Sequence, residues 1–128
     1  MSTKKVGSFG ERIAENYLKN KGYQILDRNY FFRIPGNPQK GEIDIIAQKS
    51  GIISFIEVKT LRNPNGLIRP EEKVNFAKQR KLRKTAESWL MKKRISLNTK
   101  WQIDVIAIKM GRNKKLEISH FENAIPYH

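Results

Sequence analysis

Two carboxylates and a lysine stand at the ends of two neighbouring apolar runs, where they could bind a metal ion. Residues 41–60 read GEIDIIAQKSGIISFIEVKT, and the isoleucine-rich runs flank Lys49, Ser50 and Gly51. This pattern predicts a β-hairpin. On the second strand Glu57 and Lys59 follow apolar residues on one face, so that face becomes charged where the strand ends. Burying these charges is costly unless a partner or a metal ion receives them.

The register of the hairpin decides which side chains meet. With an even number of loop residues, Asp44 lies directly opposite Glu57, and Glu42 lies opposite Lys59. Opposed residues have Cβ atoms about 5 Å apart on one side of the sheet. Two carboxylates at that separation repel each other, and a divalent cation between them removes the repulsion. The alternative is that Asp44 and Glu57 form salt bridges with Lys59 and nearby arginines, and an odd loop would place Asp44 on the other face.

The composition limits the kind of metal site and the organisation of the chain. We expect 128 residues to form a single domain, 1–128, with a basic tail at 1–6 and a C-terminal extension at 109–128. The chain has no cysteine, and both histidines, His120 and His128, are near its end. A thiolate site, a His-based zinc site and a Ser-His-Asp triad are therefore disfavoured. Oxygen ligands favour Mg²⁺ or Mn²⁺.

The net charge is +14, from 26 Lys and Arg against 12 Asp and Glu. Such an excess favours a nucleic acid as partner, with a solubilising surface or an anionic membrane surface as alternatives. The sequence has no apolar run of about 18 residues and no charged-then-apolar leader, so we expect a cytoplasmic protein without a membrane span. Basic residues crowd one segment as a candidate phosphate-binding face: Lys73, Lys78, Arg80, Lys81, Arg83, Lys84, Lys92, Lys93 and Arg94.

Local patterns predict an α/β fold in the order helix, strand, strand, strand, helix, strand, with a mixed sheet flanked by helices. A Ser8-x-x-Glu11 capping box begins the first helix, and Gly22 ends it. The other expected elements are a strand with a bulge at 23–33, a loop at 34–40, the hairpin, a loop at 61–70, a helix at 71–93, a strand at 101–108 and a short edge strand at 116–121.

This order, with Asp on the second strand and Glu-x-Lys on the third, resembles the restriction-endonuclease-like nuclease superfamily. Within it the chain is most similar to a small bacterial family of predicted endonucleases with a Holliday-junction-resolvase-like core. The matching residues are Gly10-Glu11, Ala14, Tyr17-Leu18, Gly22-Tyr23, Asn29-Tyr30, Gly41-Glu42-Ile43-Asp44, Phe55-Ile56-Glu57-Val58-Lys59-Thr60, Lys78-Gln79-Arg80-Lys81, Ala86, Trp89-Leu90 and Ile103-Asp104-Val105. The loop at 34–40 is longer than that family leads us to expect, and Asp104 has no assigned role beyond an ion pair.

The resemblance implies roles for five residues. Asp44, Glu57 and the backbone carbonyl of Val58 would bind Mg²⁺ or Mn²⁺, joined by Glu11 from the first helix. Lys59 would position or activate the attacking water, or stabilise charge on the phosphate. These roles agree with phosphodiester chemistry, in which a metal ion neutralises phosphate oxygens and acidifies water.

Arginine side chains offer further contacts to phosphate. Arg12 and Arg33 are candidate phosphate clamps because guanidinium binds phosphate in a bidentate manner, and solvated surface arginines are the alternative. Lys78, Arg80 and Lys81 belong to the basic segment.

The resulting hypothesis is a metal-dependent DNA endonuclease, with branched or junction DNA as a candidate substrate. One alternative is a non-catalytic nucleic-acid-binding module on a nuclease scaffold. A second is an RNA-binding accessory protein of translation. Coordinated cutting of two strands would favour a two-fold homodimer.

Overall fold

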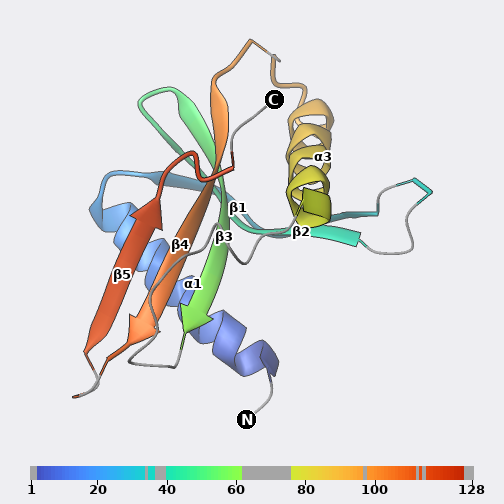
Figure 1. The fold of residues 1–128 in the computed structure, drawn as a ribbon. Coiled ribbons are helices and arrows are strands. Elements are labelled where there is room, and N and C mark those ends of the chain that lie inside the picture. The colour runs from blue at the N-terminus through green and yellow to red at the C-terminus, as the bar shows by residue number, and fades with distance from the viewer. Residues whose placement is uncertain are drawn as a thin grey trace.

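A mixed sheet with a helix on each face forms the described part of the chain (Figure 1). The computed structural model describes residues 3–33, 35–36, 40–61, 76–96, 98–111, 113 and 115–125. The elements in chain order are α1 (Thr3–Asn20), β1 (Gln24–Arg33), β2 (Lys40–Lys49), β3 (Ile52–Leu61), α3 (Phe76–Lys92), β4 (Trp101–Met110) and β5 (Leu116–Phe121). The predicted α/β class and element order are confirmed.

The five strands lie in the order β1-β2-β3-β4-β5. Only β3 and β4 run parallel, and the chain between them includes α3, as a parallel pair requires a crossover. The other neighbouring pairs are antiparallel. The short strand expected at 116–121 is confirmed as β5, so this part of the predicted C-terminal extension belongs to the sheet. The bulge expected in the first strand is also present, between Ile25 and Asp27.

Helix α1 begins earlier than the sequence suggested. It starts at Thr3, so Ser8 lies inside the helix and the predicted capping box is wrong. The predicted basic tail is wrong for residues 3–6, while Met1 and Ser2 lie outside the described residues. Glu11 therefore does not cap the helix, and capping does not explain why a glutamate stands at this position.

The end of α1 is as predicted. The backbone N–H of Tyr23 donates to the carbonyl of Leu18 at 2.9 Å, and that of Gly22 donates to Lys19 at 3.0 Å. Gly22 has a φ of 93°, which an L side chain adopts only with strain. These two bonds and the left-handed residue form a Schellman motif.

The hairpin loop holds two residues, an even number. Lys49 pairs with Ile52 across Ser50 and Gly51, whose φ angles are 53° and 78°. Two successive positive φ angles are typical of the type I′ turns that join twisted antiparallel strands.

The sheet separates two apolar clusters. One contains Phe55 of β3 with Leu82, Trp89 and Leu90 of α3, and the other contains Ile56 of β3 with Ala14 and Leu18 of α1. Alternation along β3 thus directs successive side chains to opposite helices. The expected start of the second helix, including Glu71 and Glu72, lies outside the described residues, as does Lys73.

Among the residues that the structure describes, no helix is long and apolar enough to cross a membrane.

Candidate metal centre

Strands β2 and β3 part from each other half-way along their length. Their pairs run from Lys49↔Ile52 to Ile45↔Ile56. Beyond this point β2 remains paired with β1, and β3 remains paired with β4 as far as Leu61. Because each strand keeps its outer neighbour, the sheet opens into a fork between them (Figure 1).

The fork corrects one expectation from the sequence. The even loop is confirmed, but the ladder ends one pair before Asp44 would meet Glu57. The β2–β3 ladder also ends before Glu42, so Glu42 does not pair with Lys59; its neighbour on β1 is Phe31. The direct cross-strand pairs are therefore wrong, and the side chains have to be followed individually.

Asp44 lies at the opening of the fork. Its Oδ2 accepts a hydrogen bond from the backbone N–H of Val58 at 2.7 Å, so the carboxylate bridges the two diverging strands. Burial raises the pKa of Asp44 from its ordinary value of 3.8 to about 7, the bond from Val58 lowers it, and the charges of Glu11, Glu57 and Glu42 raise it further. The metal-free pocket therefore disfavours the ionised form of Asp44, and a cation would reverse that preference.

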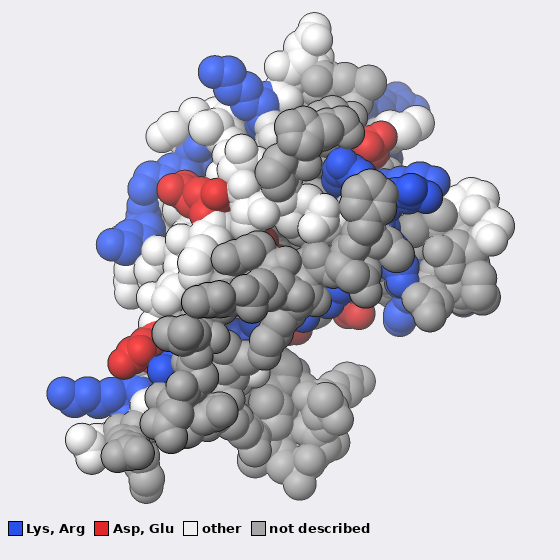
Figure 2. Space-filling view, in the orientation of Figure 1, with Lys and Arg blue, Asp and Glu red and all other residues white. Residues whose placement is uncertain are grey.

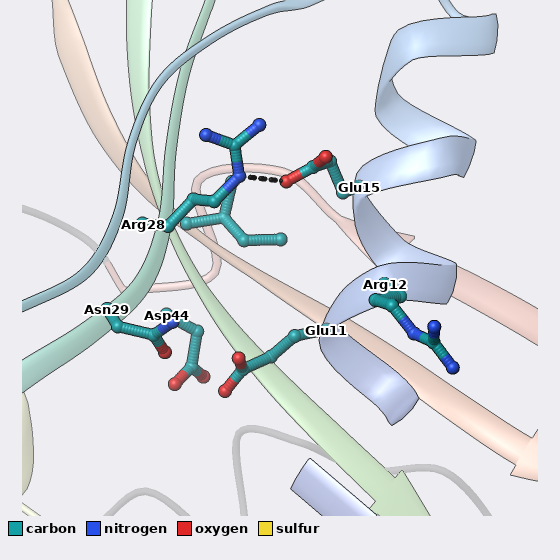
Figure 3. A pocket seen from close by; sticks show the side chains of 7 residues that line it. Glu11, Arg12, Glu15, Arg28, Asn29 and Asp44 are labelled. Atoms are coloured by element: carbon teal, nitrogen blue, oxygen red, sulfur yellow. Dashed lines mark hydrogen bonds and ion pairs between the residues drawn. The ribbon is translucent and has the colours of Figure 1, made fainter. Parts of the chain in front are cut away.

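Glu11 of α1 reaches the same pocket. This pocket has a volume of about 280 Å³ and lies between α1 and the sheet, lined by Glu11, Arg12, Glu15, Arg28, Asn29, Asp44 and Ile45. Glu11, Asn29 and Asp44 point toward one another (Figure 3). With its side-chain amide oriented so that the nitrogen faces Glu11, Asn29 donates to Glu11 Oε2 at 3.0 Å. Burial raises the pKa of Glu11, the bond from Asn29 lowers it, and the charge of Glu42 raises it.

The backbone of β1 explains why Asn29 reaches the helix. Asn29 has a φ of 49°, in the left-handed region that asparagine tolerates better than most residues. Its neighbour Arg28 also contacts α1, through an ion pair with Glu15 (Figure 3). Adjacent residues of a regular strand point to opposite faces, so this local conformation lets both reach α1. Sequence reasoning matched Asn29 to the family pattern without assigning it a role.

Glu57 approaches the fork from the other face. Its side chain is 11% exposed, and its Oε1 lies 3.4 Å from Lys59 Nζ and 2.7 Å from Lys78 Nζ of α3. Its Oε2 is buried without a hydrogen-bond partner, and no other described side chain leaves such an atom unsatisfied. A buried carboxylate oxygen without a donor costs free energy, and a cation at that oxygen would remove the cost.

The two lysines differ in their protonation preference. Burial lowers the pKa of Lys59, and the neighbouring Lys78 lowers it further, against the opposing effect of Glu57. Burial also lowers the pKa of Lys78, but its bonds with Glu57 and Lys59 outweigh burial and the net shift is upward. Lys59 is therefore the easier of the two to deprotonate. Lys78, expected only as a nucleic-acid contact, is part of the site.

The three carboxylates do not converge as a closed ligand set. Asp44 lines the pocket beside α1, whereas Glu57 contacts α3, so they reach the fork from opposite faces. In a continuous sheet this placement would separate them. Here the charge of Glu57 still raises the pKa of Asp44 through the opening.

The described residues contain one trio of ligand atoms that all lie within 4.8 Å of one another: Asp104, His120 and Glu122. Asp104 is fully buried, and its Oδ2 lies 2.8 Å from His120 Nε2. Its Oδ1 accepts bonds from Gln102 Nε2 at 3.0 Å and from the backbone N–H of Asn123 at 2.8 Å. Both oxygens have hydrogen-bond partners, so the trio has a structural explanation without a metal. The contact between Asp104 and His120 is the expected ion pair when His120 is protonated.

The predicted phosphate-binding residues are dispersed. Arg12 lines the pocket, but its guanidinium points away from Glu11 and Asp44 (Figure 3). Arg33 is exposed at the far end of β1, paired with Lys40. Arg80 is exposed on α3, and Lys81 is half-buried there. Lys and Arg side chains occupy several separate parts of the face shown in Figure 2.

Two glycines permit the close contacts that set this geometry. A Cβ on Gly10 would collide with Thr60 Oγ1 of β3, and a Cβ on Gly41 would collide with Thr85 Oγ1 of α3. Each glycine precedes a carboxylate near the fork, Glu11 and Glu42. The glycines therefore let α1 and α3 approach the sheet on either side of the site.

Comparison with known proteins assigns the chain to a family. The profile of the uncharacterised protein family UPF0102 matches residues 10–108. The chain belongs to UPF0102. A UPF0102 protein of Alkaliphilus oremlandii is 44% identical over 123 residues, covering 94% of this chain and 97% of the relative. A UPF0102 protein of Clostridium tetani is 48% identical over 105 residues, covering 82% of this chain and 80% of the relative. A UPF0102 protein of Clostridium botulinum strain 657 is 43% identical over 124 residues, covering 94% of each chain.

The matched region of UPF0102 contains all the residues at the fork, from Glu11 to Lys78. Among solved structures, the crystal structure of a protein of unknown function, AF1548, matches with a TM-score of 0.43 and 18% identity. That match covers 76% of this chain and 57% of the other.

Proposed function

We propose that this UPF0102 protein is a metal-dependent DNA endonuclease with its active site at the fork between β2 and β3. The observation that carries the proposal is the unpartnered, buried Oε2 of Glu57, beside an Asp44 that burial holds near a pKa of about 7. A cation would give the Glu57 oxygen a partner and would favour the ionised form of Asp44. The resemblance to restriction-endonuclease-like enzymes with a Holliday-junction-resolvase-like core supports the same interpretation.

The oxygen donors at the fork have the chemistry that a hard divalent cation prefers, and Asp44 and Glu57 would reach it from opposite faces of the sheet. Asp44, Glu57 and Glu11 supply carboxylate oxygens, and the backbone carbonyl of Val58 is the fourth proposed ligand. An all-oxygen set suits Mg²⁺ or Mn²⁺. When bound, such a cation would neutralise charge on a phosphodiester and acidify water near it.

The two lysines then have separate tasks. Lys59 Nζ, with its lowered pKa, is the better suited of the two to accept a proton from an attacking water. Lys78 Nζ, whose pKa is raised, retains its charge and holds Glu57 Oε1 in place. Arg12, Arg33, Arg80 and Lys81 would contact phosphates farther along the strand.

The net charge of +14 supports a polyanionic substrate, which we take to be DNA in the cytoplasm. Coordinated cutting of both strands of a junction would favour two active sites related by a two-fold axis, so a homodimer on the substrate is part of the proposal.

The test is cleavage of supercoiled, linear, forked and four-way DNA with Mg²⁺ or Mn²⁺. Wild-type protein should nick or cut at least one of these, and Asp44→Ala and Glu57→Ala should each abolish the activity. Lys100→Met, at an exposed position before β4 and outside the basic segment, is the matched control and should cut normally. Activity that survives both acidic substitutions removes the fork as active site. Binding without cleavage by the wild type would leave a non-catalytic module.

A further inference from the structure

Phe31 exposes an aromatic ring where a folded domain would ordinarily bury one. The side chain is 61% exposed on β1, and Lys40 Nζ lies 4.7 Å from the centre of its ring. An exposed phenylalanine loses the favourable free energy of burying its ring. Contact with another molecule that covers the ring would recover that free energy.

The neighbours of Phe31 on β1 show which face it occupies. Tyr30, the preceding residue, hydrogen-bonds to Ser88 of α3 at 2.8 Å. Alternation along the strand therefore places Phe31 on the opposite face, the one that α1 covers. Arg33, two residues on, shares that face, and its cross-strand partner is Lys40. We call Phe31, Arg33 and Lys40 the arm group.

The arm group lies beside the carboxylates of the fork. Phe31 has Glu42 as its cross-strand partner, and such partners lie on the same face within contact distance. The charge of Glu42 in turn raises the pKa of both Glu11 and Asp44. Phe31 is thus one cross-strand neighbour away from the proposed metal site. The β1–β2 end that carries it extends away from β4 and β5 (Figure 1).

We propose that Phe31 is a stacking platform for an unpaired base next to the cleaved phosphate, with Lys40 and Arg33 on the phosphates that flank it. An aromatic ring stacks on any base, and basic side chains follow the backbone. In a continuous duplex every base is already stacked on its neighbours, so Phe31 has no free base to contact. The substrate class that this surface fits is DNA with a single-strand to double-strand transition. This inference rests on the proposed function, because it takes the fork as the place of cleavage.

The experiment uses the full chain and compares forked DNA with a duplex of the same sequence, both in Ca²⁺ to prevent cleavage. The variants are Phe31→Ala, Phe31→Trp and the control Leu116→Ala, which removes another exposed apolar side chain on the opposite edge strand. Phe31→Ala should bind forked DNA about tenfold more weakly and duplex equally well. Phe31→Trp should retain the fork preference, and Leu116→Ala should behave as wild type.

A second readout locates the base. A 5-iodouracil at the first unpaired position should photo-crosslink to the peptide that contains Phe31, and the crosslink should be lost in Phe31→Ala and kept in Phe31→Trp. Equal fork affinity of Phe31→Ala and wild type, or a crosslink elsewhere, overturns the proposal. A wild-type protein that crosslinks through Phe31 yet cuts no DNA would refute the nuclease function and leave the stacking role standing.

Discussion

Asp44 and Val58 are joined by a hydrogen bond of 2.7 Å across the point where β2 and β3 part. A carboxylate oxygen takes the place of the backbone carbonyl that a continuous ladder would supply at that point. This bond fixes Asp44 at the opening of the sheet and leaves its other oxygen available to a ligand. The first prediction separates these two roles.

Asp44→Asn keeps an oxygen that can accept from Val58 and removes the buried charge. At pH 8 without metal, its free energy of unfolding should equal or exceed that of the wild type, because the repulsion by Glu11, Glu57 and Glu42 is lost. Asp44→Ala should be less stable than Asp44→Asn by about 1–3 kcal/mol, since the Val58 N–H loses its acceptor. Urea unfolding measures both, and equal stabilities would contradict the structural role of the bond.

The stability of the metal-free protein should depend on pH through Asp44. The folded chain keeps a proton on Asp44 up to about pH 7, whereas the unfolded chain releases it near the ordinary value of 3.8. Unfolding therefore releases a proton between these values, so the contribution of Asp44 to stability falls as pH rises through this window and levels off above it. Thermal melts in EDTA should show this trend, and Asp44→Asn should lack the corresponding part of it.

Metal binding should have the opposite pH dependence. A cation at Asp44 must displace the proton, so apparent Mn²⁺ affinity should rise roughly tenfold per pH unit below about pH 7 and flatten above it. Titration calorimetry in two buffers of different ionisation enthalpy would detect the released proton. Affinity that does not change between pH 5.5 and about 7 would contradict a site that includes Asp44.

Lys78 should compete with the metal for Glu57. Its Nζ lies 2.7 Å from Glu57 Oε1, so Lys78→Met removes one positive charge from the site and leaves that oxygen with the longer contact to Lys59 at 3.4 Å. We expect Mn²⁺ to bind roughly tenfold more tightly and DNA cleavage to slow, because Glu57 loses the contact that orients it. Lys100→Met, which removes an exposed lysine outside the basic segment, serves as the control. Weaker Mn²⁺ binding by Lys78→Met would show that Lys78 assists metal binding instead of opposing it.

His120→Ala distinguishes the fork from the Asp104 trio. It leaves a fully buried carboxylate without its ion-pair partner and should cost about 3–5 kcal/mol in the free energy of unfolding. At a temperature where the variant remains folded, its Mn²⁺ affinity should equal that of the wild type. If the folded variant no longer binds Mn²⁺, the metal site lies at the trio and the fork assignment is wrong.

The sequence alone determined the order of the elements and the presence of the hairpin, and the structure then decided that its loop holds two residues. Isoleucine runs with period-two alternation, separated by Ser50-Gly51, specify adjacent antiparallel strands because these signals act between residues close in the chain. The Schellman end of α1 at Gly22 is local in the same way. Asp44, Glu57 and Lys59 could be identified as candidates from the sequence because charges at the end of an apolar strand are costly to bury without a partner or a metal ion.

Only the tertiary structure decided how those side chains meet. The fork depends on each strand's outer neighbour, β1 for β2 and β4 for β3, and no local pattern encodes that choice. The contacts of Lys78 with Glu57 and of Asn29 with Glu11 join residues that only folding brings together, so spacing could not reveal them. The physical reason is the separation of the interacting residues along the sequence. Strand alternation and helix capping involve residues close in the chain, whereas a buried charge is stabilised by a partner that can lie on any element packed against it.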